Sequence, residues 1–99
     1  MFSIQYAKGV GNDLAGVRAF DRRQIYDRIE DQLTHQPTSE SRNKKILIGL
    51  IPPWVHVAPT WELRIGEFRV FYDVNETDCR VTVRAIRQKP LHRTTEEIL

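Results

Sequence analysis

The chain has 99 residues, enough for one domain spanning residues 1–99, and its 40% apolar and 28% charged residues exclude a disordered chain. Its single cysteine, Cys79, excludes an internal disulfide and any zinc cluster built from cysteines, as expected for a cytoplasmic protein. No apolar run approaches the roughly 18 residues that a membrane span needs. Because the start of the chain also lacks the pattern of a signal peptide, we expect a soluble, unprocessed protein.

Basic side chains are unevenly distributed along the chain, although the net charge is only +2. Residues 1–43 carry six basic and six acidic side chains, whereas residues 80–93 carry five basic ones and no acidic one. Such clustering suits a phosphate group, an acidic groove or an acidic peptide. We therefore expect an anionic partner to bind the C-terminal third.

The start of the chain predicts one strand followed by two helices. Residues 2–6 alternate apolar and polar side chains, as a short strand does, and residues 9–19 place apolar side chains at helical spacing. The second helix is predicted to begin at Asp21, with Gln24 completing a capping box, and to end before Pro37. Its buried face is predicted from apolar residues four positions apart, namely Ile25, Ile29 and Leu33.

The remainder of the chain predicts strands joined by short turns. Residues 44–50 hold a compact apolar patch and form a candidate strand, and a proline-rich loop follows. A last short helix is predicted to begin at Thr94, with Glu97 three residues later. Between these segments, alternating side chains predict three further strands, at residues 61–65, 68–74 and 80–87.

This order of elements indicates an α+β fold with a small, mainly antiparallel sheet, because short connections join antiparallel strands. We expect the two N-terminal helices to pack on one face of the sheet and to leave the other face open for function. Alternation places Val70 and Tyr72 on the face opposite to Arg69 and Phe71, but it does not say which face meets the helices.

Residues 61–74, Trp-Glu-Leu-Arg-Ile-Gly-Glu-Phe-Arg-Val-Phe-Tyr-Asp-Val, resemble the paired signature strands of the RelE/ParE superfamily. Residues 81–87, Val-Thr-Val-Arg-Ala-Ile-Arg, resemble the last strand of that family, and the strand-helix-helix start agrees. The resemblance implies the toxin of a type II toxin–antitoxin system. It also implies a cognate antitoxin as the partner, an acidic peptide that wraps around the toxin and inhibits it.

Two activities occur on this fold, and the fold alone does not distinguish them. The leading hypothesis is a RelE-like endoribonuclease, an mRNA interferase that cleaves translated mRNA at the ribosome without a metal or other cofactor. The alternatives are a ParE-like inhibitor of DNA gyrase with no catalytic activity and a degenerate member that only binds its antitoxin. These alternatives stay open because Thr60 and Glu62 stand where the RelE pattern has lysines, and Arg93-Thr94-Thr95 stands where it has a tyrosine.

RNA cleavage without a metal needs a base for the 2′-hydroxyl, a cation for the charge on the phosphoryl oxygens and an acid for the leaving 5′-oxygen. By resemblance, Arg69 matches the arginine with which RelE-like nucleases stabilise the transition state. The alternative is an ion pair of Arg69 with Asp73 or Glu67 on a solvated strand. Glu62 is the candidate base, although a structural ion pair with Arg64 is an equal possibility for it.

Other basic side chains are candidates for the remaining roles. Lys89 and His92 are the further candidate catalytic residues, and the ordinary histidine pKa of about 6.5 suits an acid or a base. Arg87 and Lys89 are predicted to flank the same groove as Arg69, or else to form a strip that docks the antitoxin. Trp54, flanked by prolines in a loop, is a candidate anchor for a partner. The candidate target-binding residues are Arg64, Arg84, Arg87, Lys44 and Lys45.

Overall fold

The computed structural model describes all 99 residues and contains a single five-stranded sheet with three helices. The strand order is β1-β5-β4-β3-β2; β1 runs parallel to β5, and every other pair is antiparallel. The prediction of an α+β fold with a mainly antiparallel sheet is therefore confirmed. In chain order the elements are β1 (Ser3–Tyr6), α1 (Val10–Asp13), α2 (Ala19–Leu33), β2 (Lys44–Ile46), β3 (Trp61–Ile65), β4 (Phe68–Asn75), β5 (Arg80–Gln88) and α3 (Thr95–Ile98).

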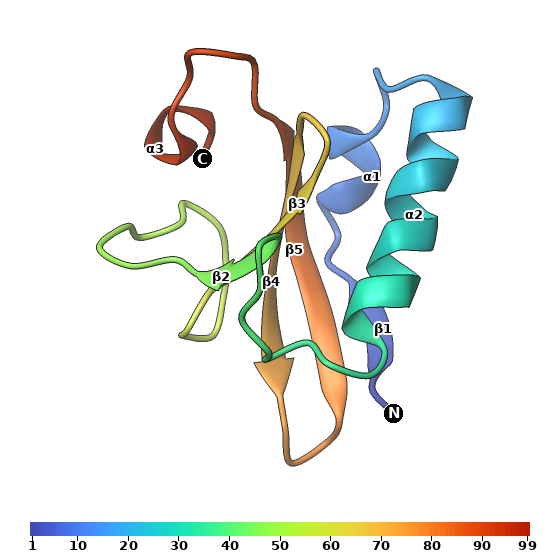
Figure 1. Cartoon of the computed structure of the whole chain (residues 1–99), viewed down its shortest axis with the longest axis vertical. Helices are drawn as coiled ribbons and strands as arrows, with labels where there is room; N and C mark the ends of the chain where they lie inside the picture. The colour runs from blue at the N-terminus through green and yellow to red at the C-terminus, as the bar shows by residue number, and fades with distance from the viewer.

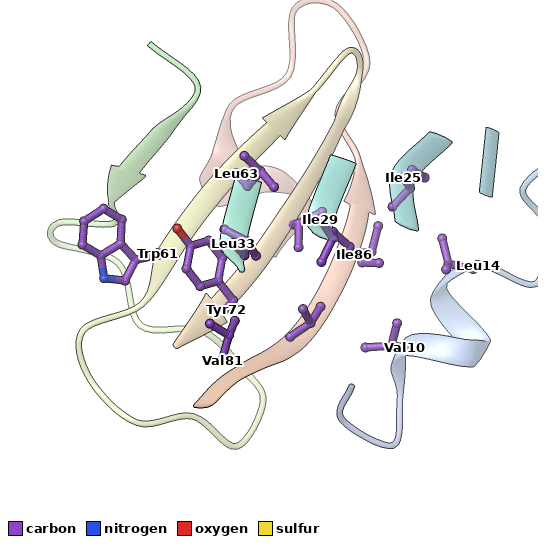
Figure 2. Close-up of a cluster of buried hydrophobic side chains, with 12 residues drawn as sticks. Val10, Leu14, Ile25, Ile29, Leu33, Trp61, Leu63, Tyr72, Val81 and Ile86 are labelled. Carbon is purple, nitrogen blue, oxygen red and sulfur yellow. The ribbon is translucent and has the colours of Figure 1, made fainter. Parts of the chain in front are cut away.

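The two faces of the sheet are covered differently. Figure 1 shows α1 and α2 on one side of the sheet, and the long loop after β2 together with α3 on the other side. The apolar side chains of α2 pack in one buried cluster with Val70 and Tyr72 of β4, as Figure 2 shows for Tyr72. Arg69 and Phe71 therefore lie on the opposite side, which we call the outer face. This packing settles which of the two sets of strand residues meets the helices.

Two N-terminal features differ from the predictions. Helix α2 begins at Ala19, and Arg18 at its N-cap makes no side-chain cap, so the prediction that Asp21 caps the helix is wrong. Asp21 lies instead in the first turn, 3.2 Å from Arg18 Nε, where a carboxylate also favours the positive end of the helix dipole. Helix α1 is only four residues long, because glycines at 9, 11 and 16 weaken the helical tendency of that stretch.

The later elements follow the predictions more closely. Strands β3, β4 and β5 agree with the predicted ranges to within one residue at either end. The capping box of Thr94 and Glu97 is present at the start of α3, so that prediction is confirmed. Strand β2 stops at Ile46 instead of continuing to residue 50, because β3 pairs with it over three residues only.

Tyr72 connects the sheet to the loop after α2. Its ring is buried, and its hydroxyl donates a hydrogen bond to the Pro37 carbonyl at 2.7 Å. Burial raises the pKa of this hydroxyl, so the folded chain keeps the proton at pH values where the unfolded chain has lost it. The free energy of unfolding should therefore fall as the pH rises above about 10, the ordinary tyrosine value.

Replacing Tyr72 by phenylalanine is expected to lower the free energy of unfolding at pH 7 by about 1–2 kcal/mol, because the Pro37 carbonyl loses its donor. The loss on raising the pH above 10 should be smaller in the variant, since one titrating group is gone. Urea unfolding at pH 7 and pH 10.5 checks both statements, with Tyr26→Phe as a control on a more exposed ring. A Tyr72→Phe variant as stable as the wild type would contradict the assigned role of the hydroxyl.

Candidate functional site

A polar cavity of about 190 Å³ opens on the outer face, where β2, β3 and β4 meet the segment that follows β5. Five of its eight lining side chains are cationic and only one is a carboxylate, so the cavity suits an anion. We call it the cationic cavity. Its lining residues are Arg42, Asn43, Lys45, Glu62, Arg64, Arg69, Lys89 and Thr95.

Strand register explains why these side chains meet. Arg64 of β3 lies directly opposite Arg69 of β4, and Glu62 lies directly opposite Lys45 of β2. Side chains directly opposite each other share a face of the sheet, and a residue two positions along lies diagonally within reach. Glu62 thus becomes the diagonal neighbour of Arg69, which no local pattern in either strand reveals.

Arg69 and Glu62 form the floor of the cavity and are both buried, at 7% and 4% exposure. Their closest atoms, Arg69 Nε and Glu62 Oε1, are 3.6 Å apart, beyond ordinary hydrogen-bond length. Burial, followed by the neighbouring Arg64, lowers the pKa of the Arg69 guanidinium, whereas Glu62 raises it. Arg69 thus pairs with Glu62. The alternative prediction of an ion pair of Arg69 with Asp73 or Glu67 is wrong, and so is the predicted pairing of Glu62 with Arg64.

Backbone carbonyls hold Arg69 in place. Its Nη1 donates to the carbonyls of Gly66 and Phe68, both at 2.9 Å, so the guanidinium is fixed against the turn between β3 and β4. Gly66 has a φ of +56°, a conformation that favours glycine, and its carbonyl reaches Arg69 from that turn. A cation held in this way is positioned before any anion arrives.

Thr95 of α3 completes the cavity and was not predicted from the sequence. Its Oγ1 donates to Glu62 Oε2 at 3.1 Å. Arg42 and Asn43, in the loop before β2, were also missed. The capping box at Thr94 located α3 along the chain, but no feature of the sequence placed this helix over β3.

Two of the predicted target-binding arginines lie outside the cavity. Arg84 pairs with Asp73, with Nε 2.8 Å from Oδ2, and Arg87 pairs with Asp13 at 2.7 Å. The guanidinium of Arg87 also lies 5.2 Å from the ring centroid of Trp54. Both arginines are thus occupied by structural contacts.

Trp54 is likewise used inside the molecule. Its ring lies 5.3 Å from that of Phe71, centroid to centroid, so the loop after β2 is packed on the outer face. Its ring contacts Phe71 and Arg87, whereas its Nε1 is buried without a hydrogen-bond partner.

The structure separates the remaining basic candidates. Lys89 and Lys45 line the cavity, whereas His92 is exposed in the turn before α3 and does not. Lys44 is 5% exposed, and its Nζ donates to the carbonyls of Gln32 and Gln36 at 3.1 and 2.8 Å. Lys44 therefore satisfies the C-terminal end of α2 on the helix side of the sheet.

The two neighbouring lysines should respond differently to replacement by methionine. Lys44→Met is expected to lower the free energy of unfolding by about 1–3 kcal/mol, because two carbonyls lose a donor. Lys45→Met should change it by less than about 0.5 kcal/mol but weaken binding of a polyphosphate probe to the cationic cavity. Urea unfolding and fluorescence anisotropy measure the two effects. Equal losses of polyphosphate binding in both variants would contradict this division.

The structure contains neither a membrane-spanning helix nor a cluster of metal ligands. No helix has the length and apolar character required to cross a membrane. No group of three or more histidine, cysteine, aspartate or glutamate side chains is arranged to hold a metal ion.

Comparison with solved structures identifies the fold. No protein-family model and no curated protein matches the sequence. The RelE–RelB complex of Pyrococcus horikoshii OT3 superposes with a TM-score of 0.68 at 21% identity, covering 94% of this chain and 98% of that one. The isolated E. coli RelE toxin gives 0.67 at 13% identity, with 98% and 94% covered. The RelBE2 toxin–antitoxin complex of Mycobacterium tuberculosis gives 0.60 at 16% identity, with 89% and 98% covered.

The chain is thus a small α+β protein with a cationic cavity on the uncovered part of its sheet. Its fold is that of the RelE toxins, along nearly the whole length of both chains.

Proposed function

We propose that this chain is the toxin of a type II toxin–antitoxin system and acts in the cytoplasm as a metal-independent endoribonuclease on translated mRNA. The observation that supports this most is the buried pair of Arg69 and Glu62 in the floor of a cavity that has four more cations. A carboxylate and a fixed guanidinium side by side offer a base and a charge stabiliser to one phosphodiester. A protein that only inhibits DNA gyrase by binding has no need of such a buried pair.

The proposed reaction uses three side chains of the cavity. The Glu62 carboxylate takes the proton of the 2′-hydroxyl, and the 2′-oxygen then forms a bond to the adjacent phosphorus. Arg69 stabilises the charge that builds on the phosphoryl oxygens. As the bond from phosphorus to the 5′-oxygen breaks, Lys89 gives that oxygen a proton. The products are a 2′,3′-cyclic phosphate and a 5′-hydroxyl, and solvent returns the proton from Glu62 to Lys89.

The rim of the cavity is proposed to bind the phosphates that flank the cleaved bond. Arg42, Lys45 and Arg64 supply three cations there, from the loop before β2, from β2 and from β3. Phosphate contacts of this kind position a strand without reading its sequence. Recognition of the codon and of the site is then left to the ribosome.

The same cations suit an acidic antitoxin as a partner. The Pyrococcus horikoshii and Mycobacterium tuberculosis neighbours are complexes of a toxin with its antitoxin. A peptide that places carboxylates over the cationic cavity would neutralise it and exclude mRNA. We propose such a peptide as the natural inhibitor of this chain.

Primer extension on mRNA held by translating ribosomes tests the proposed activity. Purified protein should produce cuts that require the ribosome, and Glu62→Gln should slow them by about 10²-fold or more, the usual contribution of a general base. Glu67→Gln is the matched control, because Glu67 is an exposed glutamate on the nearby turn. Intact mRNA in cells that the protein kills would refute the nuclease proposal, and a supercoiling assay would then test gyrase inhibition.

A further inference from the structure

Helix α3 is attached to the rest of the chain near the cationic cavity. Thr94 and Glu97 make its capping box, and the ion pair of Arg93 with Glu97 is also local, so these contacts stabilise the helix but do not dock it. The hydrogen bond from Thr95 Oγ1 to Glu62 Oε2 is the one polar contact between residues 94–99 and the body of the protein, and the apolar Ile98 and Leu99 are only half-buried. Figure 1 shows α3 on the outer side of the sheet, at the end of a long connection after β5.

Glu62 is held from two sides by groups of different kinds. Arg69 Nε lies 3.6 Å from Oε1, and the Thr95 hydroxyl lies 3.1 Å from Oε2. A carboxylate with 4% exposure needs such partners, because burying a charge without donors is costly. Removing the Thr95 hydroxyl would leave Oε2 without its donor and the carboxylate free to rotate toward Arg69.

We propose that Thr95 is a positioning residue for Glu62, and that α3 is a short lid which this hydrogen bond tethers over the cavity. The proposal rests on the proposed function, since it concerns the base of that reaction. With the lid docked, Oε2 is held at the cavity wall, and the carboxylate keeps the orientation in which it meets a 2′-hydroxyl. Thr95 itself touches no reacting atom.

Two substitutions distinguish the effect of the Thr95 hydroxyl from the effect of the shape of its side chain. Thr95→Val keeps the branched side chain and removes the donor, whereas Thr95→Ser keeps the donor. Hydrogen bonds to charged groups are among the stronger ones in proteins, so we expect Thr95→Val to reduce kcat roughly tenfold or more, with KM changed less than about twofold. Thr95→Ser should restore most of kcat. In a Glu62→Gln background, Thr95→Val should cost little further activity.

Limited digestion with trypsin tests the attachment of α3 independently of mRNA cleavage. The bond after Arg93 directly precedes α3, so loss of the tether should speed cleavage there, as measured by mass spectrometry. Cleavage after Arg18, before α2, serves as the internal control, because the polar contacts of Arg18 are with Asp21 and Arg22 of α2 and none is with α3. We expect faster cleavage after Arg93 in Thr95→Val and a wild-type rate in Thr95→Ser.

The outcomes separate this proposal from the proposed function. A wild-type protein that cleaves no mRNA would refute the function, and the trypsin rates would still decide whether Thr95 tethers α3. An unchanged rate after Arg93 in Thr95→Val would overturn the lid. A loss of kcat that is equally large in the Glu62→Gln background would overturn positioning through Glu62.

Discussion

Replacing Arg69 by alanine is expected to reduce ribosome-dependent cleavage of mRNA by about 10²- to 10³-fold, the usual loss when a preorganised group that stabilises developing charge is removed. The structure supplies the reason, because Arg69 is buried and fixed by two carbonyls in the floor of the cationic cavity. Arg69→Lys should also lose tenfold or more, since lysine keeps the charge but not the forked geometry. Quantitative primer extension on programmed ribosomes measures both effects.

Arg80→Ala provides the matched control for this experiment. Arg80 lies at the far end of β5 and pairs only with Asp78 of the hairpin, so its loss should leave cleavage within about twofold of the wild type. Circular dichroism and urea unfolding establish that each variant is folded, because removing Arg69 also leaves Glu62 without its cation. A folded Arg69→Ala protein that cleaves at the wild-type rate would refute the role assigned to Arg69.

Replacing Asp73 by alanine is expected to produce the largest loss of stability among the polar residues, about 3 kcal/mol. Asp73 is 5% exposed, pairs through both carboxylate oxygens with Arg84, and accepts the Val57 N–H at 3.0 Å. Its loss would leave a largely buried guanidinium unpaired and release the loop after β2 from the outer face. Urea unfolding measures the change in free energy.

Asp27→Ala is the control for Asp73, because Asp27 is exposed on α2 and makes no ion pair. It should change the free energy of unfolding by less than about 0.5 kcal/mol. Asp73→Asn should fall between the two, since an amide oxygen still accepts from Val57 but carries no charge for Arg84. If Asp73→Ala proved as stable as Asp27→Ala, the loop would have to be held by other contacts, chiefly those of Trp54 with Phe71 and Arg87.

Strands β3 to β5 were predictable because the alternation of side chains and the short turns that define them are local properties of the chain. The start of α2 was not predicted correctly, since Ala19 and Phe20 extend the helix by two residues before Asp21 without a side-chain cap. The end of β2 was also misjudged. How far that strand runs depends on its partner β3, which lies fifteen residues later.

Five residues of the cationic cavity were candidates for catalysis or target binding from the sequence and the resemblance: Lys45, Glu62, Arg64, Arg69 and Lys89. Lys44 was a candidate as well, although it neighbours Lys45 in a strand and the two point to opposite faces. Only the packing of α2 shows that Lys44 is on the face that the helices cover and Lys45 on the outer face.

The sequence by itself determined the class of fold, the basic C-terminal third and the strands that carry Arg69 and Glu62, because these depend on composition and on neighbours along the chain. Only the tertiary structure decided which charges remain available. Asp13 neutralises Arg87 from 74 residues away, and Thr95 reaches Glu62 from 33 residues away. Contacts between such distant positions arise from the packing of the sheet, so no local pattern predicts them.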